Sequence, residues 1–327
     1  MFSLVIPVYK NEANLDRLLQ ELVSFNERLP GELETVFVVD GSPDRCYEIF
    51  RQTLPGLPLR SQLLLLSRNF GAFSAIMAGL AAARGDHFAV LAADLQEPLS
   101  LAEEFFSRLQ DDQADVVFGA RSDRSDPIMS KFFSWIFWQT YRRFVLSDMP
   151  HGGIDVFGCN RVVRDRLLQF KESNTNLIAL LFWIGYRRSF VPYQRAERQG
   201  GKSAWTFRKK LRYCLDSVFN FTDLPLKLLL YCGLIGLLFS LIWGAAVLGA
   251  KLVGSIPVPG YAAIVIAILF FGGLTSLGLG IIGQYLWLTL QNTRQRPNYI
   301  VAGATSYDNR ATEEAAPGSS QRRTPVH

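Results

Sequence analysis

Two long stretches without charge near the carboxyl end constrain this chain more than any other feature. Residues 226–252 carry one lysine close to each end and no other charge, and residues 261–290 carry none. Each stretch exceeds the roughly 20 apolar residues that a helix needs to cross a bilayer, and the connection between them is short and rich in proline and glycine. The pattern predicts a hairpin of two transmembrane helices over 226–292, because the alternative of two buried core helices fits such lengths poorly.

Basic residues on both sides of this hairpin indicate its orientation. Arg294 and Arg296 follow it, and a cluster of lysines and arginines precedes it between 195 and 212. Because the cytoplasmic flanks of membrane helices are enriched in these residues, both termini are expected in the cytoplasm. The stretches 131–146 and 207–221 mix basic with aromatic side chains. They are expected to lie on the membrane surface, or else to pack on the domain or on another subunit.

The amino-terminal part, residues 1–225, alternates short apolar runs with helical patterns. An apolar stripe at helical spacing predicts a helix at 15–23, and further helices are predicted at Ala72–Ala83 and Leu99–Leu109. The alternation predicts an α/β fold with a doubly wound, mostly parallel sheet, in which ligands bind beyond the carboxyl ends of the strands. The tail over 293–327 is predicted to be largely disordered beyond Val301. The runs that predict strands are Phe2–Val8, Glu34–Val39, Gln62–Leu66, Phe88–Leu91 and Val116–Phe118.

Composition narrows the class of protein further. Charged residues make up 19% of the chain, below the roughly 25% of an ordinary soluble domain, which argues against a disordered chain. The four cysteines stand far apart without a C-x-x-C pair, which argues against a zinc site or a disulfide framework. The net formal charge of +5 suits an anionic membrane surface and anionic substrates. No pattern of basic and aromatic residues suggests a nucleic-acid partner.

Polar residues follow two of the predicted strands. Asp40 comes after the second strand run and precedes a tight glycine turn, where its carboxylate can accept hydrogen bonds from a base or ribose, although Asp-Gly is also an ordinary turn. Asp94 follows the fourth run, and Gln96 supplies a second oxygen two residues later. Oxygen ligands of this kind suit a divalent cation. The alternative for Asp94 is a helix N-cap in front of the helix that begins at Leu99.

Together these segments resemble the family 2 glycosyltransferases with the GT-A fold. With the two predicted spans, the chain is similar over about residues 1–300 to the polyprenyl-phosphate glycosyltransferases. These include dolichyl-phosphate-mannose synthase, the bacterial bactoprenol glucosyltransferases and the enzyme that loads undecaprenyl phosphate with 4-deoxy-4-formamido-arabinose. The segments that carry the resemblance are Val5–Glu12, Val39–Asp44, Arg68–Gly71 and Ala93–Pro98.

The resemblance implies an enzyme of the bacterial inner membrane. It would transfer a sugar, by one inverting displacement, from a nucleotide-diphosphate sugar to a polyprenyl phosphate lipid such as undecaprenyl phosphate. The reaction would take place at the cytoplasmic face and supply lipid-linked sugar for modification of cell-envelope glycans. Mg²⁺ or Mn²⁺ is the implied cofactor, a uridine diphosphate is the family's common donor nucleotide, and a homotetramer is the implied assembly.

The resemblance also assigns roles to individual residues. Asp94 and Gln96 would hold the metal ion. Asp155 would be the catalytic base, and the alternative is a turn-capping Asp after Gly152 and Gly153. The residues implied at the acceptor phosphate are Arg121, Lys131 and Ser134. The residues implied in binding the nucleotide sugar are Pro7, Tyr9, Glu12, Asp40, Arg68, Asp94, Arg198 and Ser203.

Several positions depart from the family pattern, among them Val39, Ala92 and Ala204. Ala92 stands where the metal motif Asp-x-Asp-x-Gln begins, so one carboxylate is missing there. These departures support the main alternative, a membrane-anchored pseudoenzyme or assembly scaffold. A processive polysaccharide synthase is a weaker alternative, because the chain has neither the Gln-x-x-Arg-Trp motif nor further predicted spans.

Overall fold

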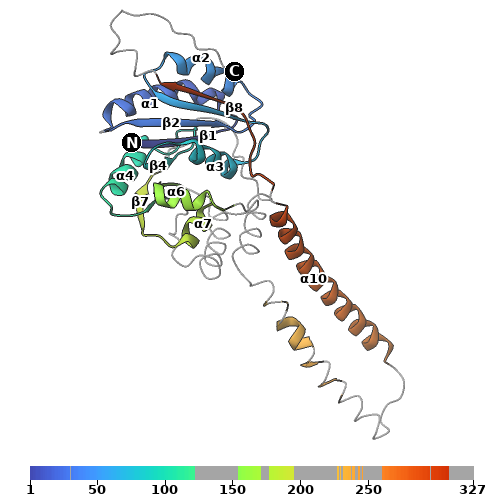
Figure 1. The fold of residues 1–327 in the computed structure, drawn as a ribbon. Coiled ribbons are helices and arrows are strands. Elements are labelled where there is room, and N and C mark those ends of the chain that lie inside the picture. The colour runs from blue at the N-terminus through green and yellow to red at the C-terminus, as the bar shows by residue number, and fades with distance from the viewer. Residues whose placement is uncertain are drawn as a thin grey trace, which may run out of the picture.

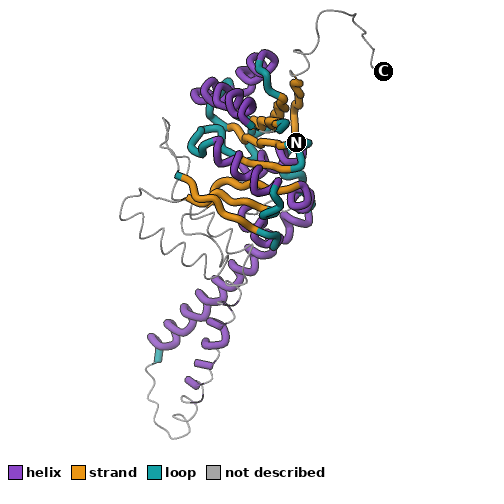
Figure 2. Tube along the Cα trace, turned by 90° about the vertical axis from the view of Figure 1, so that its left-hand side faces the viewer, coloured by secondary structure: helices purple, strands orange, loops and turns teal. Residues whose placement is uncertain are grey.

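The computed structural model describes residues 1–29, 31–121, 154–170, 177–194, 260–294 and 296–308, together with the run 231–236 and a few further residues between 227 and 245 (Figures 1 and 2). An eight-stranded sheet in the order β7-β5-β6-β4-β1-β2-β3-β8 forms the centre of the domain. The strands are β1 (Phe2–Val8), β2 (Leu33–Val39), β3 (Arg60–Leu66), β4 (His87–Val90), β5 (Val116–Arg121), β6 (Ile154–Asn160), β7 (Arg188–Tyr193) and β8 (Val301–Asp308). The helices are η1 (Glu12–Asn14), α1 (Leu15–Arg28), α2 (Cys46–Thr53), η2 (Leu54–Gly56), α3 (Ala72–Ala82), α4 (Leu99–Gln110), α6 (Arg161–Leu167), α7 (Leu177–Ile184) and α10 (Tyr261–Thr293).

The four central strands match the sequence prediction closely. β4, β1, β2 and β3 are neighbours in that order, and each pairing among them is parallel. Every residue of β2 is buried. Strands that are covered on both faces of a sheet are mostly apolar at successive positions, which is why this run was recognisable in the sequence. The predicted helices also form, and both α3 and α4 end within one residue of the predicted position.

The outer strands make the sheet mixed. β6 runs antiparallel to both β4 and β5, β8 runs antiparallel to β3, and β7 is parallel to β5. The predicted α/β class is confirmed. The sheet is mixed but mostly parallel, as expected, because among the described strands only β6 and β8 run against the direction of the others.

Helices cover both faces of this sheet (Figure 1). On one face, α1, α2 and α4 bury their apolar stripes in a first core cluster, to which α1 contributes the predicted Leu15, Leu18, Leu19 and Leu22. On the other face, α3, α6 and α7 pack in a second core cluster. The two clusters fix the strand ends in space, and the loops that follow these ends carry the candidate site.

Helix α10 projects away from the domain (Figure 1). Among the described residues it is the one helix whose length and composition would let it cross a membrane, over Phe270–Leu290. The described residues between 227 and 245 are helical and contact it. A Cβ on Gly278 would lie 3.1 Å from Leu229, and one on Gly236 would lie 3.4 Å from Phe271. The two segments therefore pack against each other in opposite directions.

The tail contains a strand that the sequence did not predict. β8 pairs with β3 from Arg60 opposite Asp308 to Leu66 opposite Val301. The prediction of a largely disordered tail is therefore wrong for Val301–Asp308. The open edge of β3 supplies backbone partners for this segment, and its mostly small, exposed side chains give little sign of that pairing. The stretches 131–146 and 207–221, predicted at the membrane surface, lie outside the described residues.

Candidate functional site

The predicted donor residues follow strands that end at one edge of the sheet. Val8 at the end of β1 lies opposite Val39 of β2, and Val39 lies opposite Leu65 of β3. This parallel register brings Tyr9 and the loops that contain Asp40 and Arg68 to the same edge. Tyr9 is exposed there. Edges of this kind are where open α/β sheets bind ligands.

Asp40 is buried and holds the next loop by its carboxylate. The backbone N–H groups of Phe70 and Gly71 donate to its two oxygens at 2.7 and 2.8 Å, and its side chain is only 2% exposed. Burial raises the pKa of Asp40, while the two backbone hydrogen bonds and the charge of Arg68 oppose that rise. Asp40 thus fixes the loop Ser67–Gly71, and the predicted contact with a base stays a prediction.

Arg68 is the cation that this loop presents. Its guanidinium lies 4.1 Å from the centroid of the Phe70 ring, and it donates to the carbonyl of Asn69 at 3.2 Å. The side chain is exposed at the sheet edge. Because Asp40 fixes the amides of Phe70 and Gly71, the position of the Arg68 charge depends on a carboxylate that is itself hidden from solvent.

Gly41 lets the two loops approach each other, which gives a direct prediction. Its φ is +53°, and a Cβ there would lie 2.2 Å from the carbonyl carbon of Arg68. Gly41→Ala must therefore push the Arg68 loop away, and we expect the KM of any donor that Arg68 binds to rise about tenfold or more. Steady-state kinetics measure this change. Gly56→Ala is the matched control, because no atom lies within 4 Å of the added methyl group; equal effects from both variants would contradict the prediction.

The loops after β1 and β2 are joined by a second polar network. Lys10 N–H donates to Ser42 Oγ at 2.8 Å, and Ser42 donates to Asp44 at 2.6 Å. The N–H of Glu12 donates to Asp44, and the Glu12 carboxylate accepts from the N–H of Arg45. Although burial works in the other direction, these hydrogen bonds lower the pKa of Asp44. Glu12, predicted at the nucleotide, therefore also anchors the start of α2.

Asp94 and Gln96 lie on the loop after β4 and flank a residue with unusual backbone geometry. Leu95 has a φ of +55°, which is uncommon for a branched side chain. The N-cap of α4 is Pro98, and no side chain caps that helix. The alternative interpretation of Asp94 as an N-cap is therefore wrong. One oxygen of the Asp94 carboxylate accepts a hydrogen bond from the backbone N–H of Gln96 at 3.4 Å.

The topology brings the start of β6 to the same edge. β6 is antiparallel to β4 and β5, so Asp155 near its beginning lies where β4 and β5 end. β6 pairs with β4 as far as Phe157 opposite Val90, and its pairing with β5 shifts register at Asp155, between Val156 opposite Gly119 and Ile154 opposite Ala120. Arg121, the last residue of β5, lies at this edge as well. Asp155 belongs to a strand rather than to a turn.

The structure thus brings the described members of the predicted site toward one edge of the sheet. Sequence reasoning did not single out Ser42 and Asp44 as anchors of the β1 loop, although both belong to the Val39–Asp44 motif. A serine and a carboxylate directly after a strand were the available signal. The predicted residues that lie outside the described part of the chain are Lys131, Ser134, Arg198 and Ser203.

Comparison with known proteins places the chain among enzymes that transfer sugars. The model of glycosyl transferase family 2 matches residues 3–200. The bactoprenol glucosyl transferase of Shigella phage SfV is 31% identical over 301 residues, covering 91% of this chain and 97% of that protein. A prophage bactoprenol glucosyl transferase homolog of Escherichia coli strain K12 is 30% identical over 301 residues, with 91% and 97% covered.

Among solved structures, the mannosyltransferase PcManGT from Pyrobaculum calidifontis, in complex with GDP-Man and Mn²⁺, is 15% identical with a TM-score of 0.45. It covers 88% of this chain and 87% of its own. The family match spans more than half of the chain and includes the sheet edge described above. The chain is a glycosyltransferase and belongs to glycosyl transferase family 2.

Proposed function

We propose that this enzyme transfers a sugar from a nucleotide-diphosphate sugar to a polyprenyl phosphate at the cytoplasmic face of the bacterial inner membrane. The proposal rests on two features that occur in one chain. One is the glycosyl transferase family 2 domain with the candidate site at the edge of its sheet, and the other is an apolar helix that extends from the domain. The relatives named bactoprenol glucosyl transferases, matched along nine-tenths of the chain, support a polyprenyl acceptor.

The anchor in this proposal is a hairpin of two membrane helices. Its second helix is α10, and its first is formed by residues 226–252. Packing of Leu229 near Gly278 and of Gly236 near Phe271 supports an antiparallel pair. Two antiparallel spans keep both ends of the hairpin on one side of the bilayer, and the basic flanks favour the cytoplasmic side. Anchoring the domain there raises the effective concentration of a lipid-bound acceptor.

Electrostatics dominates the proposed reaction because both reactants are anions. Arg68 at the donor end, with Arg198 and Ser203 as proposed partners, would neutralise diphosphate charge as the nucleotide leaves. Arg121, Lys131 and Ser134 would hold the acceptor phosphate. A phosphate monoester has a second pKa of about 6, so the acceptor is mostly a dianion at neutral pH and attacks the anomeric carbon directly, with inversion.

The donor set after β4 fits a divalent cation. Asp94 and Gln96 offer one carboxylate and one amide oxygen, and cations such as Mg²⁺ are commonly held by one or two carboxylates together with substrate phosphates. Mg²⁺ or Mn²⁺ bound there would supply positive charge to the leaving diphosphate. Within the described residues no group of three or more His, Cys, Asp or Glu side chains is arranged for a metal ion. In the proposed site the remaining ligands would therefore be diphosphate oxygens of the nucleotide sugar.

Turnover by the purified full chain tests the proposal. The protein in detergent, with undecaprenyl phosphate and either Mg²⁺ or Mn²⁺, is offered a panel of nucleotide sugars, and both nucleoside diphosphate release and lipid-linked sugar are measured. We expect one donor to give both products in equal amounts. A scaffold would bind nucleotide without releasing it, and a processive synthase would extend the product beyond one sugar; either result would overturn the proposal.

Ala92→Asp tests the cation assignment. The substitution adds a carboxylate two residues before Asp94, at the position where the family motif begins. A second carboxylate strengthens binding of a hard cation, so we expect the Mg²⁺ or Mn²⁺ concentration for half-maximal activity to fall about tenfold. Metal titration of chelator-treated enzyme measures this value. Ala93→Ser, a small polar change at the adjacent buried position, is the control. An unchanged metal response in Ala92→Asp would remove Asp94 from the proposed metal site.

A further inference from the structure

The donor loop Ser67–Gly71 is held from two sides. Asp40 binds the amides of Phe70 and Gly71 from within the domain. From the other side, the N–H of Ser67 donates to the carbonyl of Ile300 at 3.0 Å. Ile300 belongs to the segment that joins α10 to β8, so a residue distant in sequence contacts the loop that presents Arg68.

Tyr299, next to Ile300, anchors this segment in the domain. Its ring packs against the second core cluster, on whose margin Phe70 and Phe73 also pack. Burial raises the pKa of the Tyr299 phenol, which is consistent with a ring set into apolar surroundings. Immediately afterwards β8 joins β3, with Val301 opposite Leu66. The segment is thus fixed at the point where β3 gives way to the donor loop.

The same segment is directly connected to the membrane anchor. α10 ends at Thr293, and Tyr299 follows six residues later. The linker leaves little slack between the two, since six residues span at most about 20 Å even when fully extended. The end of the candidate membrane helix and the donor loop therefore have a short covalent and hydrogen-bonded connection.

We infer that Tyr299 and Ile300 form a positioning element that seats the carboxyl end of the membrane anchor on the donor loop and so sets the place of Arg68. The inference rests on the proposed function for the identity of the donor. Tyr299 packs against the same core cluster as Phe70, and its effect passes through the hydrogen bond from Ser67 N–H to the neighbouring Ile300. A displacement of about 1 Å in a charged group that positions a substrate can lower the rate far more than the loss of the contact with Tyr299 itself would suggest.

Two tyrosines on either side of β8 provide a matched test. Tyr299 precedes the strand beside the donor loop, whereas Tyr307 lies opposite Ser61 near the other end of β3 and packs against the first core cluster. Tyr299→Ala and Tyr307→Ala each remove a half-buried ring by which the same tail packs against the domain, one ring on each core cluster. Tyr299→Phe keeps the ring and removes only the hydroxyl group. The full chain in detergent is used throughout.

For Tyr299→Ala we expect the KM of the donor and the Kd of the nucleoside diphosphate to rise about tenfold, with kcat and the KM of the polyprenyl phosphate within twofold. Amide hydrogen exchange of Ser67–Gly71 should accelerate. Tyr307→Ala and Tyr299→Phe should leave these values as in the unchanged protein. Equal effects of the two alanine variants, or unchanged exchange in Tyr299→Ala, would overturn the inference. Because exchange needs no turnover, it reports on the loop even if the panel of nucleotide sugars refutes the proposed function.

Discussion

Asp155→Asn will lower turnover by about 10²-fold or more, because misplacing a reactant by about 1 Å can cost that much rate. Asp155 is the second residue of β6, which runs antiparallel to β4, so it lies toward the end of the sheet where the Asp94 loop leaves β4. The substitution removes a negative charge but keeps the size of the side chain, so strand β6 and its pairings should remain. Steady-state kinetics with saturating donor and acceptor measure the loss.

The pH dependence of that loss separates two roles for Asp155. If Asp155 only removes a residual proton from the acceptor, the loss will shrink above the second pKa of the phosphate monoester, about 6. If it orients the acceptor, the loss will persist across neutral pH. We expect persistence, because the acceptor is already mostly a dianion there. Full activity of Asp155→Asn at every pH would exclude the residue from the mechanism.

Asp165→Asn is the matched control for this substitution. Asp165 lies on α6, directly after β6, and pairs with Arg164 at 2.7 Å while its side chain is 55% exposed. The Arg164 side chain is only 13% exposed, but it also donates to the carbonyls of Leu80 and Ala83 and so keeps acceptors in the variant. Helix α6 follows the opposite end of β6 from Asp155. The control should therefore keep normal kinetics, and a loss in both variants would indicate a general effect of charge on the domain.

The sequence predicts best those strands whose apolar runs correspond to residues that are buried in the structure. β1 and β2 are buried along their lengths, so continuous apolar runs mark them. β8 has mostly exposed side chains and joins the sheet through its backbone alone along most of its length. Backbone pairing at a sheet edge leaves no hydrophobic period to detect, which explains why the strand was missed.

In the candidate site, too, features within a short stretch of sequence could be predicted, whereas contacts between residues far apart in the chain could not. Asp40 and Gly41 could be recognised as a strand end and a tight turn. The partners of Asp40, however, lie 30 and 31 residues further along the chain, and Ile300 reaches Ser67 from the tail. Such contacts depend on the order of strands in the sheet, which a single sequence does not specify. Sequence therefore identified which residues gather at the edge, while the structure revealed what holds them there.

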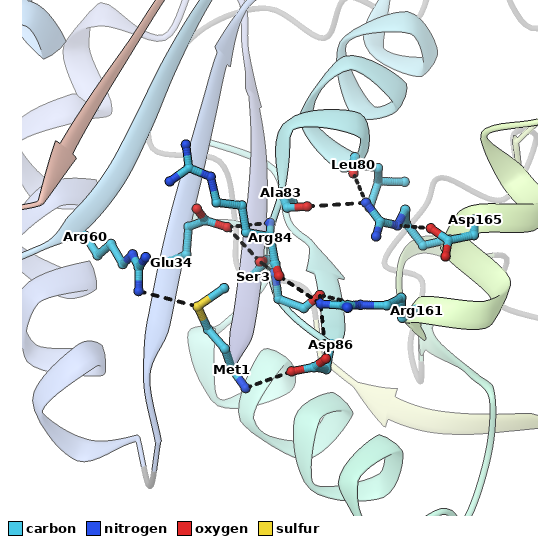
Figure 3. Close-up of polar contacts among 12 residues, drawn as sticks. Met1, Ser3, Glu34, Arg60, Leu80, Ala83, Arg84, Asp86, Arg161 and Asp165 are labelled. Atoms are coloured by element: carbon cyan, nitrogen blue, oxygen red, sulfur yellow. Dashed lines mark hydrogen bonds and ion pairs between the residues drawn. The ribbon is translucent and has the colours of Figure 1, made fainter.

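The polar network around Glu34 lies at the opposite edge of the sheet from the site and carries the largest expected effect on stability (Figure 3). Glu34 is 1% exposed. Its carboxyl oxygens accept from the Ser3 hydroxyl at 2.9 Å, the Gln62 amide at 2.8 Å and the Arg84 N–H at 2.8 Å. The Glu34 carboxylate therefore joins β1, β2, β3 and the segment after α3. Because the site is buried, water has little access to take over these hydrogen bonds.

Glu34→Ala will destabilise the domain because it leaves these donors without their acceptor. Each unsatisfied buried donor costs about 1–3 kcal/mol, so we expect a total of about 3 kcal/mol, or a Tm lower by about 6–12 °C for a domain of this size. Glu32→Ala is the control, since Glu32 is 64% exposed and pairs with Arg60 at 3.5 Å. Thermal unfolding of the detergent-solubilised chain should show almost no shift for Glu32→Ala.

Kinetics below the lowered Tm distinguish a structural from a catalytic origin of any lost activity in Glu34→Ala. Glu34 is near the amino end of β2, whereas Asp40 directly follows its carboxyl end at Val39. The strand is rigid and buried between these points, so the remaining folded enzyme should keep its donor KM while its thermal lifetime shortens. Equal Tm values for Glu34→Ala and Glu32→Ala would show that the buried network contributes no more than an exposed ion pair. A raised donor KM at low temperature would instead show that the two edges of the sheet are coupled.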